Sequence, residues 1–278
     1  MSPTTGQLSV KFWGVRGSIP TPIAQNMGVG GNTSCLEVRL PGGEVLIVDG
    51  GTGARQLGQA LSAEMEGKPA NLHFFLTHFH WDHIQGLPFF QPLYSKDNSV
   101  TFYSMKSPEV TQDILEGQMD VPYFPVDFRF LPAQRNFVGV NGQTFRFGDT
   151  EVKSFPLHHP QGCHGYCFTH EGRKLVFASD LEHGDTTLDN MLLEVARDAD
   201  ILIFDAQFTP EEYEKRHGWG HSTWLQATEV AKKTGAKKLL LFHHDPGHSD
   251  EALAGILNDA RSRFKETYLA VEGESHGI

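Results

Sequence analysis

The stretch Thr77-His78-Phe79-His80-Trp81-Asp82-His83 comes directly after the short apolar run of residues 72–76. That run predicts a buried strand, because it is short, rich in aromatic residues and followed by polar ones. Side chains two positions apart on an extended segment point the same way, so His78 and His80 can bind one cation. If a helix begins at Asp82, then Asp82 and His83 face another side. Imidazoles with one carboxylate suit Zn²⁺, and also Mn²⁺ or Fe²⁺.

Further residues of the metal-binding type follow later apolar runs. His158 and His159 end one predicted strand, Asp180 follows another, and His243 with His244 ends a third. Proteins of the α/β class place their chemistry at strand ends. One histidine at such a place is usually structural, but four such strand ends favour a metal site over a histidine-rich surface loop without a ligand.

The amino-acid composition favours a globular protein with a hydrophobic core over a membrane protein or a disulfide-rich one. Apolar residues make up 39% of the 278, which is enough for a core. No run approaches the roughly 18–20 apolar residues of a membrane span, and residues 1–7 do not resemble a signal peptide. Three cysteines, Cys35, Cys163 and Cys167, form no disulfide framework and fit a reducing compartment. We therefore expect a cytoplasmic protein without membrane contact.

The net charge of −11 also limits the partners of the protein. An acidic chain is poorly suited to an extended nucleic-acid surface, whereas a small anionic substrate held by metal ions remains compatible with it.

The order of predicted elements indicates one α/β domain over residues 1–278, with no repeat, low-complexity tract or linker. Asp82 is expected to be the N-cap of a helix that runs to about residue 90. Asp49, at the end of a strand, lies either near the metals or in a turn. Strands are expected at residues 8–13, 35–40, 44–48, 72–76, 100–103, 144–147, 151–155, 174–178, 201–204 and 238–242, and helices at 54–65, 82–90, 108–119, 223–234 and 250–264.

The motifs together resemble those of the metallo-β-lactamase superfamily over nearly the whole chain. The resemblance rests on His78-x-His80-x-Asp82-His83, followed by His159, Asp180 and His243. The segments Phe12-Trp-Gly-Val-Arg-Gly-Ser-Ile-Pro20, Gly31-Asn-Thr-Ser-Cys35 and Val48-Asp-Gly-Gly-Thr-Gly53 look like its phosphodiesterase branch. That branch includes ribonuclease Z and small cyclic-nucleotide phosphodiesterases.

The resemblance implies a four-layer αββα sandwich and two divalent metal ions, with zinc as the first candidate and manganese or iron as the others. It implies that Asp180 bridges the two ions. His159 is preferred to His158 because it precedes Pro160, as in the histidine-proline-glycine pattern of the family. The implied ligands are His78, His80 and His159 for the first ion, and Asp82, His83 and His243 for the second.

Two later segments resemble motifs of ribonuclease Z, namely Ile203-Phe-Asp-Ala-Gln-Phe208 and Gly220-His-Ser-Thr223. By that match His221 contacts the scissile phosphate and Asp205 orients its imidazole, while Asp82 counts among both the metal ligands and the catalytic residues. The alternative for His221 is a residue beside a helix cap.

The chain departs from the family pattern in one place. The glycine-tyrosine-arginine of the family is Gly165-Tyr166-Cys167 here, so an expected basic group is missing, and His164 is an additional histidine nearby. The spacing of Cys163 and Cys167 is not that of a zinc ribbon, and we expect both to be structural.

The expected reaction is hydrolysis of a small or cyclic phosphodiester, such as a 3′,5′- or 2′,3′-cyclic nucleotide, by a hydroxide that two metal ions share. Alternatives are tRNA 3′ trimming as in ribonuclease Z, hydrolysis of a lactone, thioester or β-lactam, and a non-enzymatic metal or redox scaffold. The acidic charge disfavours tRNA. Only twenty residues separate His159 from Asp180, too few for the long arm with which ribonuclease Z grips tRNA. The Asp205 and His221 pair favours phosphodiesters over other esters. Relatives are often homodimers, but the sequence alone leaves the oligomeric state open.

Overall fold

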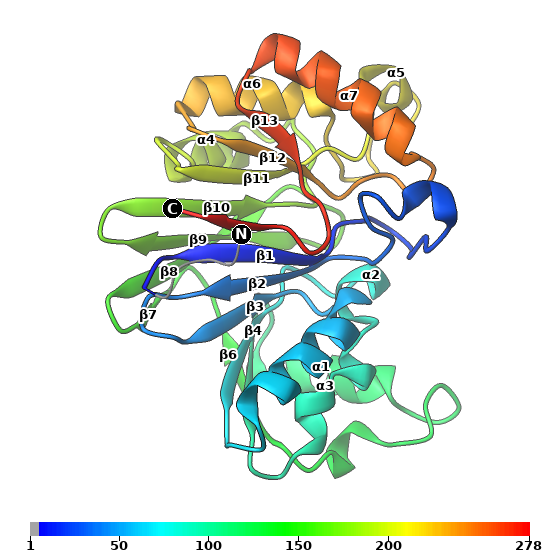
Figure 1. The fold of residues 1–278 in the computed structure, drawn as a ribbon, viewed down its shortest axis with the longest axis vertical. Coiled ribbons are helices and arrows are strands. Elements are labelled where there is room, and N and C mark those ends of the chain that lie inside the picture. The colour runs from blue at the N-terminus through cyan, green and yellow to red at the C-terminus, as the bar shows by residue number, and fades with distance from the viewer. Residues whose placement is uncertain (1–5) are drawn as a thin grey trace.

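The computed structural model describes residues 6–278 and contains two seven-stranded β-sheets (Figure 1). In the first sheet the strand order is β14-β1-β2-β3-β4-β5-β6, and in the second it is β13-β12-β11-β10-β9-β8-β7. The strands of the first sheet are β1 (Ser9–Gly14), β2 (Cys35–Arg39), β3 (Val45–Val48), β4 (Asn71–Phe75), β5 (Ser99–Ser104), β6 (Gln134–Gly139) and β14 (Ser275–Gly277). Those of the second are β7 (Thr144–Phe147), β8 (Thr150–Leu157), β9 (Cys163–His170), β10 (Arg173–Ala178), β11 (Ile201–Asp205), β12 (Leu239–Phe242) and β13 (Thr267–Leu269).

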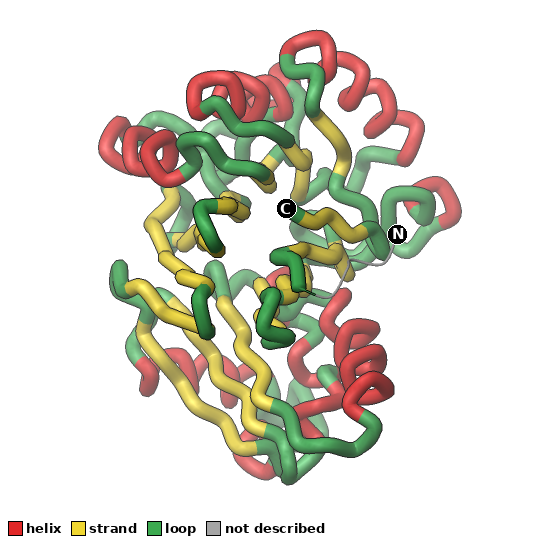
Figure 2. Tube along the Cα trace, turned by 60° about the vertical axis from the view of Figure 1, so that its left-hand side comes forward, coloured by secondary structure: helices red, strands yellow, loops and turns green. Residues whose placement is uncertain are grey.

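Helices cover the outer face of each sheet, so that the chain forms the four-layer αββα sandwich predicted from the sequence (Figures 1 and 2). The helices are α1 (Gly53–Met65), α2 (Trp81–Ile84), α3 (Pro108–Gln118), α4 (Thr186–Val195), α5 (Pro210–Tyr213), α6 (Trp224–Thr234) and α7 (Asp250–Arg263). Short 3₁₀ turns occur at η1 (Ala24–Asn26), η2 (Leu87–Phe89), η3 (Gln91–Tyr94) and η4 (Phe128–Phe130). Over residues 6–278, every helix is too short or too polar to cross a membrane.

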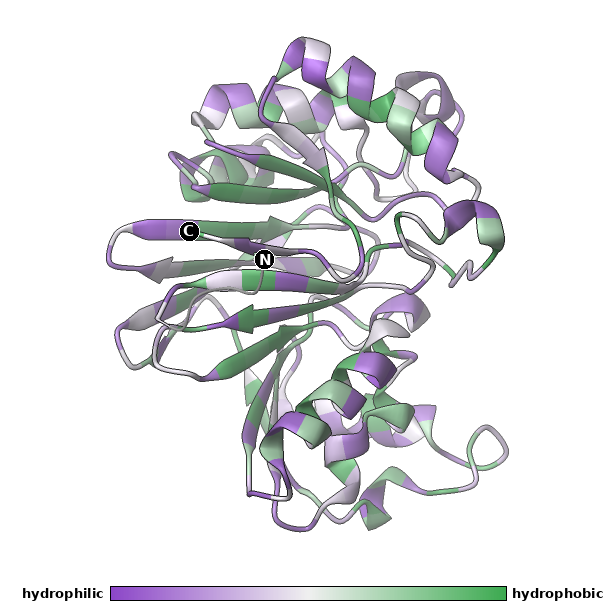
Figure 3. Cartoon of the chain, in the orientation of Figure 1, coloured by the Kyte–Doolittle hydropathy of each residue, from purple (hydrophilic) through white to green (hydrophobic). Residues whose placement is uncertain are grey.

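Two adjacent phenylalanines of β4 show how the layers are built. Neighbouring residues of a strand point to opposite faces of the sheet. Phe74 belongs to the core between the first sheet and its helices, with its ring 4.9 Å from that of Phe90. Phe75 belongs to the core between the two sheets, with its ring 5.3 Å from that of Tyr166 in β9. The buried strands β3, β11 and β12 are accordingly hydrophobic along most of their length. In helices α6 and α7, hydrophobic and hydrophilic residues alternate instead (Figure 3).

The predicted helix from Asp82 to residue 90 is wrong. Helix α2 has only four residues, and His80 rather than Asp82 is its N-cap. The carboxylate of Asp82 does not cap the helix, because it accepts the backbone N–H of Ser18 at 2.7 Å. The helix ends early because the N–H of Gly86 donates to the carbonyl of Gly50 instead of to the preceding turn.

The direction of the strands brings distant residues to one edge. Strands β10, β11 and β12 are parallel neighbours, so their carboxyl ends lie side by side. Asp180 follows β10, Asp205 is the last residue of β11 and His243 follows β12. In the first sheet β3 and β4 are also parallel, which places Asp49 beside the start of the histidine motif.

Candidate metal centre

The seven predicted metal ligands lie together where these strands end. Their nitrogen and oxygen atoms form groups of three whose members are within 4.8 Å of one another. One group, here called the triple-histidine cluster, contains His78, His80 and His159. A second group, here called the aspartate cluster, contains Asp82, His83 and His243. These two groups contain the residues of the two ligand sets that the resemblance implies, and three further groups overlap them and include Asp180, His221 or Asp205.

Asp180 lies between the two clusters. Its Oδ1 is 3.3 Å from Nε2 of His83 and 3.3 Å from Nε2 of His243. The same oxygen is 3.9 Å from Nε2 of His78. The other oxygen, Oδ2, accepts the hydroxyl of Ser179 at 2.9 Å. One buried carboxylate therefore faces candidate ligand atoms of both clusters.

The histidines of the aspartate cluster are oriented by acceptors on their far side. Nδ1 of His83 donates to Asp49 Oδ2 at 2.7 Å, and Nδ1 of His243 donates to Gln207 Oε1 at 2.8 Å. A partner on Nδ1 fixes the tautomer and leaves Nε2 free for a metal ion. Asp49, for which the sequence left two roles open, therefore lies at the site. Gln207 was missed, although it belongs to the ribonuclease Z-like segment.

Neutral groups orient the triple-histidine cluster. Nδ1 of His159 donates to the carbonyl of Gly220 at 2.8 Å, and Nε2 of His80 donates to Gln161 Oε1 at 3.3 Å. Nε2 of His159 lies 3.2 Å from Nδ1 of His80. Nε2 of His78 is buried and has no hydrogen-bond partner within residues 6–278. These inward-facing nitrogens are the atoms that a cation would engage.

Three residues of the site have a left-handed backbone. The φ angles of Asp49, Asp180 and His243 are 61°, 63° and 60°. A non-glycine residue pays about 1–2 kcal/mol for this conformation, although aspartate and histidine adopt it more often than bulkier residues do. Each of them follows a strand directly or two residues later, so backbone strain is concentrated at this edge, as is common at functional sites.

The surroundings shift the pKa values of the imidazoles in opposite directions in the two clusters. Burial lowers the pKa of His159 to about 4 and the pKa of His78 well below its usual value. Burial opposes the charged form of His243 too, but Asp180 and Asp82 raise its pKa to about 9. In the same way Asp180, Asp82 and Asp49 outweigh burial and raise the pKa of His83. The carboxylates therefore attract positive charge to this centre, which a proton or a metal ion can provide.

His221 and Asp205, the predicted catalytic pair, lie against both clusters. Nδ1 of His221 donates to Asp205 Oδ2 at 2.9 Å. The ring centroid of His221 is 5.3 Å from that of His159 and 4.9 Å from that of His243. Asp205 also accepts the backbone N–H groups of Asp180 at 3.0 Å, Gln207 at 3.0 Å and Ser222 at 3.2 Å. The pair is thus fixed by the strand ends, and Nδ1 is the nitrogen of His221 that Asp205 engages.

The other histidines and cysteines named from the sequence lie outside these groups. His158 is exposed, whereas His159 is buried among the ligands. His164 is half-buried in β9, and burial lowers its pKa. Cys163 and Cys167 are buried free thiols whose pKa values are raised by burial. None of these four residues belongs to a ligand group within the described part of the chain.

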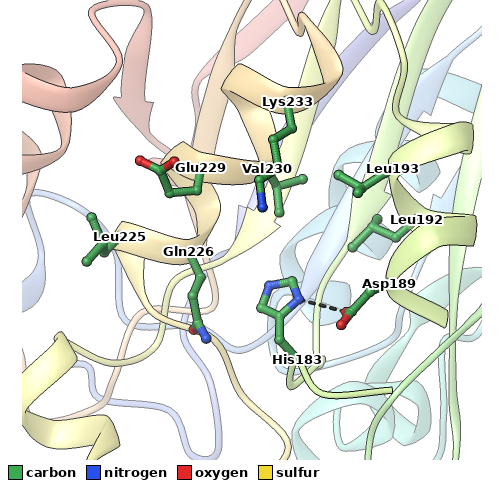
Figure 4. Close-up of a pocket in the computed structure, with 9 residues that line it drawn as sticks. All are labelled: His183, Asp189, Leu192, Leu193, Leu225, Gln226, Glu229, Val230 and Lys233. Carbon is green, nitrogen blue, oxygen red and sulfur yellow. Dashed lines mark hydrogen bonds and ion pairs between the residues drawn. The ribbon is translucent and has the colours of Figure 1, made fainter. Parts of the chain in front are cut away.

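A separate cavity of about 410 Å³ lies between α4 and α6. Figure 4 shows its apolar wall of leucines, with Lys233 above and His183 below. Nδ1 of His183 donates to Asp189 Oδ1 at 2.8 Å. None of the nine residues that line this cavity is a predicted metal ligand, so it is distinct from the metal centre.

Comparison with known proteins defines the class. Residues 45–244 match the family described as beta-lactamase superfamily domain. The chain therefore belongs to the metallo-β-lactamase superfamily. Within it the chain is a hydrolase of the branch that contains ribonuclease Z and phosphodiesterases, as the motifs predict.

Two relatives and one solved structure illustrate the similarity. Ribonuclease Z of Geobacillus kaustophilus is 40% identical over 95 residues, which cover 34% of this chain and only 31% of the relative. Ribonuclease Z of Thermoplasma acidophilum is 26% identical over 307 aligned positions, which cover 94% of this chain and 93% of the relative. The metallo-beta-lactamase fold protein YhfI of Bacillus subtilis has the same fold, with a TM-score of 0.75 at 20% identity, covering 98% of this chain and 100% of that one.

The fold implies divalent metal ions, and the residues fit them. Seven nitrogen and oxygen donors converge, and several nitrogens face one another, as Nε2 of His83 and Nε2 of His243 do at 3.3 Å. The unpartnered Nε2 of His78 lies in the same place. Imidazole nitrogens with carboxylate oxygens are the donor set of zinc and of neighbouring first-row ions.

Proposed function

We propose that the protein is a dinuclear metal-dependent phosphodiesterase that acts on small or cyclic nucleotide phosphodiesters, with zinc as the first candidate metal. The triple-histidine cluster would hold one ion, the aspartate cluster the other, and Asp180 would bridge them. The observation that carries this proposal is the position of His221, whose ring lies against one histidine from each cluster.

When bound, two such ions would lower the pKa of a water molecule and neutralise charge on a phosphoryl oxygen. The residues of the chain supply the rest. Asp205 holds Nδ1 of His221, so Nε2 is the nitrogen that meets the substrate. From there His221 can donate a proton to the leaving oxygen or stabilise the charge on a phosphate oxygen. No serine or cysteine nucleophile is needed.

Ribonuclease Z activity is the second candidate, because both sequence relatives carry that name. Two observations favour small substrates instead. The alignment with the Thermoplasma enzyme has 307 positions, more than the 278 residues of this chain, so the relative has segments without a counterpart here. The net charge of −11 is also unfavourable for a tRNA-sized polyanion.

Specificity constants measured at one salt concentration separate the candidates. The substrates are 2′,3′- and 3′,5′-cyclic nucleotides, bis-p-nitrophenyl phosphate, a precursor tRNA and a β-lactam, all with zinc-, manganese- or iron-loaded protein. We expect the small diesters to be cleaved and the tRNA and the lactam to remain intact. Efficient trimming of the precursor tRNA would assign the protein to the second candidate, and cleavage of the lactam alone would exclude both.

A further inference from the structure

The loop that precedes His221 is bound to a single carboxylate. This loop, residues 213–220, is here called the strap. Oε1 of Glu182 accepts the hydroxyl of Tyr213 at 2.7 Å and the N–H of Gly218 at 2.8 Å. Oε2 accepts the same N–H at 2.9 Å and the N–H of Gly220 at 3.0 Å. Glu182 is only 7% exposed, so it joins both ends of the strap from inside the protein.

Glu182 is also connected to the metal centre through its own backbone. It lies two residues after Asp180, and its N–H donates to the carbonyl of His158 at 2.8 Å. The preceding carbonyl, of Leu181, accepts the hydroxyl of Ser222 at 2.8 Å. Three segments that carry Asp180, His159 and His221 are therefore bound together around this side chain.

Gly220, the last residue of the strap, is in direct contact with His159. Its carbonyl accepts Nδ1–H of His159, which leaves Nε2 of His159 for the triple-histidine cluster. The φ angle of Gly220 is +83°, and a Cβ at this position would lie 2.3 Å from Nδ1 of His159 and 2.3 Å from Pro160. The strap thus packs on His159 without room for a side chain, and His221 is the next residue.

We propose that Glu182 is a positioning residue of the metal centre, which locks the strap and thereby orients both His159 and His221. The proposal rests on the proposed function only for its effect on turnover. A carboxylate is required because both of its oxygens accept. The amide of a glutamine has one accepting oxygen, and its NH₂ group would face the N–H of Gly218 or Gly220.

Glu182→Gln is the main test variant, and Asp200→Asn is its matched control. Asp200 is another buried carboxylate, which accepts the N–H of Lys174 at 2.8 Å and the ammonium of Lys237 at 2.7 Å. It lies at the start of β11, whereas the metal ligands lie at the carboxyl ends of the strands. Its loss should reduce stability without reaching the metal centre.

The measurements use the full chain loaded with Co²⁺ or Zn²⁺. In Glu182→Gln, the cation of the triple-histidine cluster should bind about 10–100-fold more weakly, as after loss of an outer-shell partner. The visible cobalt spectrum should change accordingly, and amide exchange at Gly218 and Gly220 should accelerate. With bis-p-nitrophenyl phosphate and saturating metal, kcat should fall while KM stays close to the wild-type value. Asp200→Asn should leave all four readouts unchanged.

Unchanged cobalt binding in Glu182→Gln with faster exchange at Gly220 would overturn the proposal, and so would equal metal loss in Asp200→Asn. If Glu182→Gln does not fold, Tyr213→Phe provides the test. It removes one donor to Glu182 and should loosen the strap and the cation by a smaller factor, and wild-type behaviour there would also overturn the proposal. A wild-type protein that cleaves no diester would refute the proposed function instead, and the metal and exchange readouts would still decide the role of Glu182.

Discussion

The histidines of the triple-histidine cluster and those of the aspartate cluster donate hydrogen bonds to different kinds of acceptor. His83 and His243 of the aspartate cluster are fully buried and rest on a carboxylate and an amide oxygen. In the triple-histidine cluster His159 rests on a backbone carbonyl, and His80 rests on a glutamine at the longer distance of 3.3 Å. A cavity of about 290 Å³ lined by His78, His80 and Gln161 adjoins it.

Under the proposed function, this difference predicts that the two clusters hold their cations with unequal strength. Carboxylate support raises the basicity of a ligand imidazole and fixes its ring, so the aspartate cluster should hold its cation more tightly. The triple-histidine cluster is more open, because it adjoins a cavity and His80 is only half-buried. We therefore expect its cation to exchange first and to be the one nearer the entering substrate.

Asp180→Asn should reduce turnover more than any other substitution, because Asp180 contacts both clusters and its loss should weaken cation binding at both. Its Oδ1 faces His83, His243 and His78. We expect loss of both cations and a fall in turnover of more than about 10³-fold, since the metal ions account for several kcal/mol of transition-state stabilisation. Elemental analysis and diester turnover measure this. Asp185→Asn, which removes a carboxylate charge at the N-cap of α4 in the same segment but keeps an accepting oxygen, is the control and should keep both cations. Full activity after exhaustive chelation of the wild type would exclude a metal-dependent reaction.

His221→Ala should have the next largest effect and should spare both clusters. His221 belongs to neither cluster, although it lies against His159 and His243 and shares one group of candidate ligand atoms with each of them. We expect two retained cations and a loss of turnover of about 10²–10⁴-fold, the usual contribution of one acid–base or charge-stabilising histidine. Asp205→Asn should lose less turnover, because it keeps the imidazole of His221 and only weakens the hydrogen bonds that Asp205 accepts from His221 and from the neighbouring backbone N–H groups.

The double variant and the leaving group refine this assignment. If Asp205 and His221 act as a unit, the double variant should be no worse than His221→Ala, and additive losses would contradict that. A p-nitrophenolate leaving group should depend less on His221 than an alkoxide does if His221 is the general acid. Undiminished turnover of His221→Ala on every diester would falsify its catalytic role.

Local patterns predicted most of the strands and the place where they end, whereas the αββα arrangement and the two ligand groups were expected from the resemblance to the superfamily. The run of residues 72–76 forms β4, displaced by one residue, since its apolar side chains fill cores on both faces of the sheet. His78 and His80 fall in the same cluster, as alternation along an extended segment predicts. Strand ends that carry aspartate or histidine do meet at one edge, because β10, β11 and β12 are parallel.

The parts that sequence could not predict depend on contacts between distant segments. Asp82 has the residue type of an N-cap, but the N–H of Ser18, 64 residues away, takes its carboxylate. Strand β9 was missed because its glycine, histidines and cysteines have low apolar periodicity, although pairing with β8 and β10 buries most of it. Glu182 contacts the strap through the N–H of Gly220, and Gln207 contacts the imidazole of His243. Both partners are more than thirty residues away in the sequence, so neither contact could be predicted locally.

Asp49→Asn should weaken cation binding at the aspartate cluster much more than at the triple-histidine cluster. Asp49 supports His83 directly, and an amide at this position loses the charge of the acceptor. We expect the cation of the aspartate cluster to bind about 10–100-fold more weakly, with a smaller change at the triple-histidine cluster. Stepwise titration with a chelator checks this, because the order in which the two equivalents leave should reverse or merge. Loss of the triple-histidine cation alone would contradict the comparison.

Gln161→Ala should have the smallest effect and should act on the other cluster. Its Oε1 accepts Nε2–H of His80 at 3.3 Å, and both residues line the adjoining cavity. A neutral hydrogen bond at this distance is weak, since such a bond contributes only about 0.5–1.5 kcal/mol even at good geometry. The first equivalent of metal should therefore leave at a chelator concentration lower by a few-fold, while the second leaves as in the wild type. Gln134→Ala, in an exposed glutamine of β6, is the control and should change neither step. Because Gln161 borders the cavity, the KM for bulky diesters should also rise more than the KM for cyclic ones. If Gln161→Ala instead displaced the second equivalent, the triple-histidine cluster would be the tighter site and the assignment of the exchangeable cation would be reversed.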